Sequence, residues 1–271
     1  PIDHSLSWGK RHASPFRASF DGVGLRGWNL GEANLVKSVE LVARDESWGT
    51  YPPSIQHAET LSATGSFGFR QGSVRWQTEV TLLDEGWKLA CKVEAATPVD
   101  TNRTGLVLLH ALDCIDQDLR VEHVDGSVSQ MRFPRLIAPT QPAMDIRSLS
   151  YAPADGLWLE LRFEGDTFEM EDQRNWLDAS FKTYCRPHAM PKPYELVPGK
   201  PVEQSITARL EQRPVQVRIV EPPVASARVP AVGLGVPLGS PLPTDAERNM
   251  LRQLAPAFFL IEHLLGDSLD S

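Results

Sequence analysis

Apolar and polar side chains alternate one by one over most of the sequence between residues 16 and 220. The alternation is clearest in residues 74–82, 87–93 and 157–163. Successive side chains of a β-strand point to opposite faces, so this period predicts strands that each bury one face. An antiparallel sheet with one solvated side produces this pattern, whereas a helix would space its apolar residues three or four positions apart.

Turn-forming residues separate the alternating stretches. Clusters of Asp, Glu and Gly stand at residues 84–86, 125–126 and 155–156, and they predict tight turns, several of them in hairpins. We count about a dozen candidate strands and no amphipathic helix before residue 240. The predicted fold class is therefore mainly β, a large antiparallel β-sandwich or supersandwich.

The composition changes near residue 221. Residues 221–231 are rich in proline, which removes sheet hydrogen-bond donors and favours extended chain, so they predict a linker. A short apolar strand is predicted at 232–236, and the capping box at 244–247 predicts the start of a helix. The apolar run 258–262 predicts a second strand, and residues 263–265 fit either a strand or a helix.

These segments divide the chain into three parts. The prediction is a β-sandwich domain over residues 1–220, a linker over 221–231 and the beginning of a β/α domain over 232–271. A single strand–helix–strand unit cannot bury its own apolar faces. We therefore expect either that a larger β/α domain, cut short here, continues past Ser271, or that residues 232–271 dock on the sandwich as a tail.

The charge and the apolar content argue against several classes of protein. The formal net charge is −8, which argues against nucleic acid as a partner, because phosphate binding needs clustered Lys and Arg. No apolar run reaches the ~20 residues that span a bilayer, so we predict no membrane partner. Residues 1–4 lack the charged and apolar regions of a signal peptide, and the expected location is the cytoplasm.

The cysteines and the absence of familiar motifs limit the chemistry further. Cys91, Cys114 and Cys185 are odd in number, widely spaced and without a CxxC pair, which argues against a disulfide framework or a zinc site. The sequence contains no HExxH, GxSxG, Walker or GxGxxG motif. We therefore predict neither a metal nor a cofactor, and the sequence leaves a homo-oligomer open.

The polar run 164–184 is the segment richest in reactive side chains. If residues 168–172 form a strand, Glu169 and Glu171 share one face, while Asp172 lies on the other. Paired carboxylates can raise one pKa by repulsion and so create a general acid or base near neutral pH. The alternative is a solvated strand end with ordinary salt bridges.

Three residues that follow this strand add binding groups. Arg174 and Asn175 supply hydrogen-bond donors for a carbonyl or a carboxylate. Trp176 offers an aromatic face for the apolar side of a sugar ring. A second polar group lies upstream, where Arg103 precedes an apolar strand that ends at His110.

Histidine is the side chain best suited to proton transfer at neutral pH. His110 and His123, together with a Glu, could therefore serve acid–base work on a carbonyl or hemiacetal. The alternative is that each is a hydrogen-bonded structural residue at a strand end.

The run from Glu169 to Lys182, EMEDQRNWLDASFK, followed by Tyr184, resembles the signature of the D-apionate lactonase family, bacterial enzymes of apiose catabolism. The resemblance extends from about residue 35 to the end and implies a β-sandwich followed by a barrel-like β/α domain, of which only the start is present. It implies that residues 258–262 are the first barrel strand of a considerably longer protein. Supporting stretches are residues 44–50, 102–105, 109–110, 121–126, 133–134, 139 and 141–142.

We therefore hypothesise hydrolysis of a sugar-acid lactone, of the type D-apionolactone to D-apionate, in bacterial carbohydrate catabolism. The expected partner is a small sugar lactone or sugar acid, and the expected sandwich is galactose mutarotase-like. A carboxylate or a histidine would activate water, the guanidinium and amide donors would stabilise the oxyanion, and a lysine would hold the carboxylate product. The predicted catalytic residues are Glu171, Asp172, His110 and His123, and the predicted substrate-binding residues are Arg103, Glu169, Arg174, Asn175, Trp176 and Lys182.

Two other functions stay open. The chain could be a carbohydrate-binding sandwich without catalysis, attached to a missing barrel that carries the active site on its strand-end loops. It could also be an aldose 1-epimerase-like isomerase, since large sandwiches with paired His and Glu suit ring opening. His110 and His123 flanking one pocket opposite a Glu would favour the isomerase, and a cleft with aromatics but no acid–base pair would favour binding.

Overall fold

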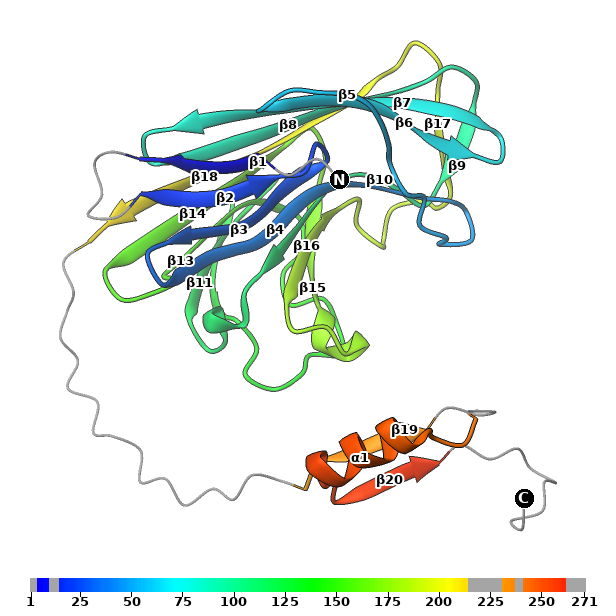
Figure 1. The fold of residues 1–271 in the computed structure, drawn as a ribbon. Coiled ribbons are helices and arrows are strands. Elements are labelled where there is room, and N and C mark those ends of the chain that lie inside the picture. The colour runs from blue at the N-terminus through cyan, green and yellow to red at the C-terminus, as the bar shows by residue number, and fades with distance from the viewer. Residues whose placement is uncertain (1–3, 10–14, 214–230, 237–240, 262–271) are drawn as a thin grey trace. The chain divides into compact units, whose positions relative to one another are not determined.

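A sixteen-stranded antiparallel sheet makes up most of the protein (Figure 1), in a computed structural model that describes residues 4–9, 15–213, 231–236 and 241–261. The first eight strands are β1 (His4–Trp8), β2 (Phe16–Phe20), β3 (Gly24–Leu30), β4 (Ala33–Arg44), β5 (Ser54–Ala58), β6 (Ser62–Phe69), β7 (Gly72–Leu83) and β8 (Gly86–Ala95). The others are β10 (Arg103–His110), β11 (Asp118–His123), β12 (Val128–Arg132), β13 (Ile146–Tyr151), β14 (Leu157–Glu164), β15 (Phe168–Asp172), β16 (Phe181–Cys185) and β18 (Val202–Gln212).

The strands follow one long path of hydrogen-bonded neighbours. Its order is β1-β2-β3-β4-β10-β16-β15-β13-β14-β18-β8-β7-β6-β5, with β11 and β12 attached beside β13. The small strands β9 (Val99–Thr101) and β17 (Tyr194–Leu196) form a separate antiparallel pair. Two short 3-10 helices, η1 (Leu112–Cys114) and η2 (Gln173–Trp176), follow β10 and β15.

The predicted alternation is confirmed in the strands where it was clearest. Along β7, every second residue from Val74 to Val80 is buried and the residues between them are exposed. In β8, buried residues alternate with partly exposed ones from Trp87 to Ala95, and in β14 buried and exposed residues alternate from Leu159 to Phe163. The turn at residues 84–86 joins β7 and β8 in a hairpin, and those at 125–126 and 155–156 join β11 to β12 and β13 to β14. Burial of one face of each strand is what drives these segments into a sheet.

The long sheet curls so that its two arms pack against each other (Figure 1). The indole rings of Trp28 on β3 and Trp87 on β8 meet edge to face, with their centroids 5.7 Å apart. The Trp8 indole donates to the carbonyl of Gly86 at 2.7 Å, which ties the first strand to the opposite arm. The predicted class, a mainly β, large antiparallel sandwich, is therefore confirmed, with eighteen described strands before residue 213 where about a dozen were expected.

The C-terminal elements form the predicted strand–helix–strand. Strand β19 (Gly233–Val236) pairs in parallel with β20 (Phe258–Ile261), and α1 (Asp245–Leu254) connects them. The predicted capping box is present, because the Thr244 side chain accepts from the Glu247 backbone while the Glu247 side chain accepts from the Thr244 backbone. Large apolar side chains remain exposed on this small unit, among them Met250, Leu254 and Phe259.

The chain divides into two compact units, Pro1–Gln216 and Val217–Ser271. The linker predicted at residues 221–231 lies outside the described residues except for Ala231, as do residues 263–265. The predicted domain boundaries therefore stay a prediction. In the described ranges, no helix is both long enough and apolar enough to cross a bilayer.

Trp76 tests the packing of the sheet. Its side chain is 2% exposed and lies against Gly65 of the neighbouring strand, where an added Cβ would come within 2.5 Å of the indole. We expect Trp76→Ala to lower the free energy of unfolding by about 3–5 kcal/mol, as for other large buried aromatics. Trp176, which is 71% exposed, provides the matched control, and Trp176→Ala should change stability by less than about 0.5 kcal/mol. Urea unfolding followed by fluorescence measures both, and an unchanged midpoint for Trp76→Ala would contradict the packing.

A deletion tests the predicted boundary between the domains. All seven tryptophans lie before residue 177, so tryptophan fluorescence reports only on the large sheet. We expect a chain without residues 224–271 to unfold cooperatively at the same urea concentration as the full chain, because a proline-rich linker marks a domain boundary. Loss of cooperative unfolding would show that the C-terminal elements are part of the core of the sheet.

Candidate functional site

The candidate site is built on β15 and β16 and their neighbours β10 and β4. The register places Glu171 opposite Lys182 and Glu169 opposite Tyr184, and directly opposed residues of antiparallel strands share a face. Asp172 lies opposite Phe181, on the other face, where both are fully buried. The strand predicted at residues 168–172 is thus confirmed, and it separates the carboxylates into two environments.

A cavity of about 450 Å³ lies over this part of the sheet. Three of its side chains are cationic and one is a carboxylate, so its lining carries a net positive charge although the chain carries −8. The cavity therefore attracts an anion, because salt screens the more distant negative charges of the chain. The cavity is lined by Arg44, Trp48, Arg103, Glu171, Gln173, Trp176, Lys182 and His188.

Arg103 is the most unusual residue of the cavity. Its side chain is 2% exposed, and its guanidinium carbon lies 3.8 Å from the centroid of the Tyr184 ring and 5.4 Å from that of Trp48. Its Nε and Nη2 atoms form no hydrogen bond to any described residue. Buried polar groups are nearly always hydrogen-bonded, so two open donors on a buried cation indicate a place for an acceptor. A carboxylate or an oxyanion matches this planar fork.

Glu171 and Lys182 form an ion pair across the two strands. The Lys182 Nζ atom lies 2.9 Å from the Glu171 carboxylate, and the Trp176 indole donates to the same carboxylate at 2.7 Å. Burial lowers the pKa of Lys182, Glu171 opposes that shift, and Arg103 and Arg44 add to it. Burial acts to raise the pKa of Glu171, but the hydrogen bonds and charge of Lys182 and Trp176 outweigh it and lower that pKa. The carboxylate is therefore held ionised.

The loop after β4 brings Trp48 to the cavity. The Asp45 side chain accepts from the backbone N–H groups of Ser47 and Gly49, at 2.9 and 2.7 Å, which closes the turn. Asn102, just before Arg103 in the chain, donates to the carbonyl of Glu46 at 2.9 Å. Two stretches that carry the family resemblance, residues 44–50 and 102–105, therefore lie side by side at the cavity.

His188 lines the cavity, and sequence reasoning did not single it out. Its backbone N–H donates to the Glu169 carboxylate at 2.8 Å, and the Tyr184 hydroxyl donates to the same oxygen. The imidazole lies beside Trp48 and Tyr184, with centroids 5.5 and 5.8 Å away. Burial lowers the pKa of His188, and Arg103 lowers it further. The one feature of the sequence that could have pointed to His188 is that it lies six residues after Lys182, just past the end of the strand that carries Lys182.

The two predicted histidines do not lie together at the cavity. His110 is fully buried in the core, with its ring nitrogens 3.1 Å from the Tyr151 hydroxyl and 2.7 Å from the Thr183 hydroxyl. Burial lowers the pKa of His110 to about 3. His123 bonds through its ring nitrogens to the Met144 carbonyl and the Ser129 hydroxyl. Neither lines the cavity, so the structure does not bring them together with Glu171 and Lys182.

Asp172, Arg174 and Asn175 also have partners that differ from the predicted ones. The Arg174 guanidinium donates to both Asp172 oxygens and to the backbone carbonyls of residues 134–136. Asp172 accepts from the Ala138 N–H at 2.8 Å, and the Asn175 amide donates to the Ala138 carbonyl. These three side chains hold residues 134–138 in place and do not line the cavity, so the structure does not bring them to the predicted oxyanion site.

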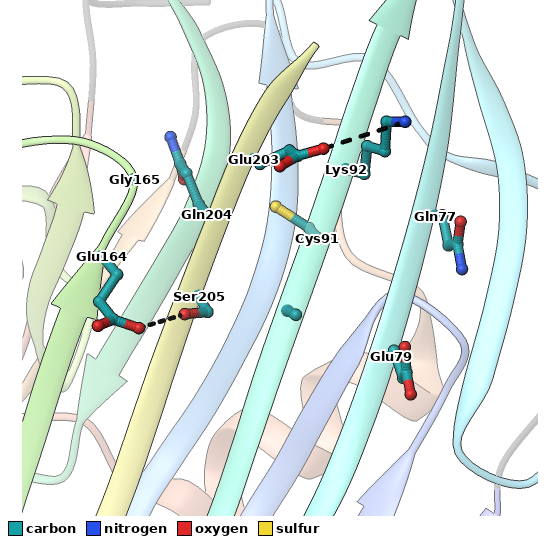
Figure 2. Close-up of a pocket in the computed structure, with 10 residues that line it drawn as sticks. Gln77, Glu79, Cys91, Lys92, Glu164, Gly165, Glu203, Gln204 and Ser205 are labelled. Atoms are coloured by element: carbon teal, nitrogen blue, oxygen red, sulfur yellow. Dashed lines mark hydrogen bonds and ion pairs between the residues drawn. The ribbon is translucent and has the colours of Figure 1, made fainter.

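A second cavity of about 350 Å³ lies on β14, β18, β8 and β7 (Figure 2). Three of its charged groups have partners: the Lys92 Nζ atom lies 4.0 Å from the Glu203 carboxylate, and the Ser205 hydroxyl donates to Glu164 at 3.0 Å. Burial raises the pKa of the Cys91 thiol, which leaves it protonated and unreactive. Among the described residues, no buried polar atom of this lining lacks a hydrogen bond, in contrast to Arg103 in the first cavity, so it is the weaker candidate. Its lining is Gln77, Glu79, Ala90, Cys91, Lys92, Glu164, Gly165, Glu203, Gln204 and Ser205.

Among the described residues, no group of three or more His, Cys, Asp and Glu side chains is arranged to hold a metal ion. The first cavity contains several groups that can bind or react. These are a buried guanidinium with open donors, an ionised carboxylate–lysine pair, an imidazole and two aromatic rings. Such a set can bind an oxyanion, hydrogen-bond hydroxyl groups and pack against a sugar ring.

The sequence matches known proteins over most of its length. The family model of the D-apionate lactonase N-terminal domain matches residues 6–213. A D-apionate lactonase of Brucella anthropi is 30% identical over 292 aligned positions, which cover 97% of this chain and 48% of that protein. The chain therefore spans about half the length of the curated relative it matches.

Solved structures with a similar fold were also found. A galactose mutarotase-like protein from Lactobacillus casei is 11% identical, with a TM-score of 0.49, and the match covers 76% of this chain and 100% of that one. An aldose epimerase homologue from C. elegans is 10% identical, with a TM-score of 0.47, covering 79% of this chain and 100% of the homologue. At these scores the likeness concerns the fold alone.

The buried His110 predicts how stability depends on pH. Its folded-state pKa of about 3 lies below the ordinary 6.5, so below pH 6.5 the unfolded state takes up a proton that the folded state does not. The stability it contributes is complete above pH 6.5 and is lost as the pH falls toward 3. Between pH 7 and pH 5, wild-type protein should lose about 2 kcal/mol more unfolding free energy than His110→Gln.

Urea unfolding at the two pH values measures this difference. The matched control is His57→Gln, because the His57 side chain is 71% exposed, and it should keep the wild-type pH dependence. Equal losses in wild-type protein and His110→Gln would mean that His110 is not buried as a neutral group.

Proposed function

Since the chain belongs to the D-apionate lactonase family through its N-terminal domain, we propose that the cavity over β15 and β16 binds a sugar-acid lactone and takes part in its hydrolysis. The observation that carries the proposal is the buried Arg103 guanidinium with two open donors. Hydrolysis of a lactone passes through a tetrahedral oxyanion and ends in a carboxylate. Both are acceptors that this guanidinium can bind.

Arg103 would act mainly on the transition state. In the lactone, the carbonyl oxygen carries only a partial negative charge, whereas the attack of water places a full charge on it. A fixed cation in a half-buried cavity binds the charged form more strongly, and this differential binding accelerates the reaction. The π faces of Tyr184 and Trp48 hold the guanidinium in place before substrate arrives.

The other cavity residues would bind the rest of the sugar. Glu171 and Lys182 offer an acceptor and donors for hydroxyl groups, and Lys182 adds positive charge for the carboxylate product. Trp176 offers an exposed aromatic face for ring carbons. Of the predicted substrate-binding residues, we keep Arg103, Trp176 and Lys182 in contact with substrate, and Glu169 as a support for the loop that carries His188.

The substrate and the larger enzyme that we propose are taken from the Brucella anthropi relative. It is a D-apionate lactonase, so D-apionolactone is the substrate we propose first, in bacterial carbohydrate catabolism in the cytoplasm. Because this chain spans about half of that relative, we propose that it acts as part of a longer enzyme with a further β/α domain. The parallel β19–α1–β20 unit with its exposed apolar side chains supports such a continuation.

A second candidate is a carbohydrate-binding domain without catalysis. The aromatic rings of Trp48 and Trp176, 37% and 71% exposed, favour it, because such faces bind sugars in many binding modules. The isomerase alternative has no such support, because His110 and His123 do not flank one pocket.

The test is hydrolysis of D-apionolactone followed in a pH-stat, with this chain and with the whole protein that contains it. We expect Arg103→Lys to lower kcat/KM by about 10²–10³, since a lysine keeps the charge but loses the planar donor pair. Arg174→Lys is the matched control, and it should lower stability with little effect on the turnover of folded protein. Binding of D-apionate without hydrolysis in either form of the protein would favour the carbohydrate-binding function.

A further inference from the structure

We propose that His188 is the general base of this reaction and takes a proton from the water that attacks the lactone carbonyl. The inference rests on the proposed function and adds to it a residue that neither the sequence reasoning nor the family match assigns. His188 lines the same cavity as Arg103, and both contact the rings of Trp48 and Tyr184. A proton acceptor and an oxyanion donor thus border one space.

The carboxylates near the cavity are poor bases. Glu171 is paired with Lys182 at 2.9 Å and accepts from the Trp176 indole, and both partners stabilise its ionised form. Glu169 is 1% exposed, and its carboxylate accepts from the Tyr184 hydroxyl and the His188 N–H. Asp172 lies on the core face in a pair with Arg174. Of the three, only Glu171 lines the cavity, and its pairing with Lys182 makes it a weak proton acceptor.

The His188 imidazole differs from these groups because it has no hydrogen-bonded partner among the residues that the structure describes. The described residues offer no hydrogen bond to either of its ring nitrogens, and the residue is exposed. Its main chain is nevertheless anchored, because the His188 N–H donates to Glu169 at 2.8 Å. The imidazole and the Tyr184 ring pack in a T-shaped arrangement, at an interplanar angle of 73°. A ring nitrogen that bonds to no described residue, on a residue anchored at the edge of the cavity, is available to accept a proton from water there.

The charges around His188 keep its imidazole neutral. Burial is the largest influence and lowers its pKa from 6.5, and the nearby cations Arg103 and Lys192 lower it further. The carboxylates Glu169 and Glu171 act in the opposite direction, but the net shift is downward. At pH 7 the ring is therefore unprotonated, the form that accepts a proton.

The step balances without any further reactant. The water oxygen bonds to the lactone carbonyl carbon, its proton goes to a His188 ring nitrogen, and the carbonyl electron pair moves to the oxygen that faces Arg103. When that electron pair returns, the ring C–O bond breaks, and the departing alkoxide oxygen takes the proton from the imidazolium. The product is a hydroxy acid, which releases one proton to solvent and leaves a carboxylate beside Arg103.

The first part of the test is the rate and its pH dependence. His188→Gln should lower kcat by about 10²–10⁴ and leave KM nearly unchanged, since Arg103 and Lys182 still bind the substrate. In the wild-type protein, kcat/KM should fall as the pH drops below 6.5 through the lowered pKa of His188. In His188→Gln, kcat/KM should no longer fall over this pH range. His57→Gln is the matched control and should keep both the rate and the pH profile.

The second part separates a catalytic role from a structural one. Addition of imidazole should restore part of the activity of His188→Ala, because His188 is exposed and a free base can enter the space it leaves. D-Apionate binding by calorimetry should be the same in wild-type protein and variant, which checks that the cavity is intact.

The outcomes distinguish the assignment of His188 as the base from the proposed lactonase function. Full activity and an unchanged pH profile in His188→Gln and His188→Ala would overturn the assignment of the base and leave the proposed lactonase intact. No hydrolysis of D-apionolactone by wild-type protein, either as this chain or within the whole protein, would overturn the proposed function and the base with it.

Discussion

Phe168 pairs with Cys185 and Asp172 with Phe181, and this register between β15 and β16 divides the polar run into two sets of side chains. Glu169, Glu171 and their partners on β16 lie on the cavity face, while alternate residues lie in the core. A shift of β15 by one residue would move Glu169 and Glu171 to the core face and separate Glu171 from Lys182. The core face prevents such a shift, because Phe168, Met170 and Phe181 are fully buried there. The position of the site is therefore a consequence of hydrophobic packing on the opposite side of the sheet.

The packed sheet supports the buried guanidinium of Arg103, whose burial lowers the stability of the fold. Moving a guanidinium out of water is unfavourable by several kcal/mol unless its donors are satisfied. The rings of Tyr184 and Trp48 compensate only in part, because a cation–π contact is worth about 0.5–2 kcal/mol. An acceptor bound to Nε and Nη2, as in the proposed function, would recover part of the remaining free energy. A stable sheet that holds such a group open is suited to binding an anion tightly.

The sequence predicts the features of the fold that depend on local pattern. Alternation identified the strands around Trp76 and Trp87, and the capping box at Thr244 identified the start of α1, because both signals lie within a few residues. It could not predict which polar side chains are structural. His110 bonds to Tyr151 and Thr183, and Arg174 to carbonyls about forty residues away, and such long-range partners follow only from the order of strands. His188 was missed for a related reason, since it lies in a loop where no period applies.

The charges of the cavity fit a reaction that turns a neutral molecule into an anion. A lactone carries no net charge, so Arg44, Arg103 and Lys182 gain little from binding it by Coulomb attraction. The oxyanion and the carboxylate carry a full charge, and these three cations attract both. Groups that stabilise the transition state in this way also retain the product, which must then leave against their attraction. The ion pair of Lys182 with Glu171 moderates this effect, because the fixed carboxylate already neutralises one cation. In the proposed reaction, Arg103, whose Nε and Nη2 atoms bond to no described residue, would therefore set the balance between stabilising the transition state and releasing the acid.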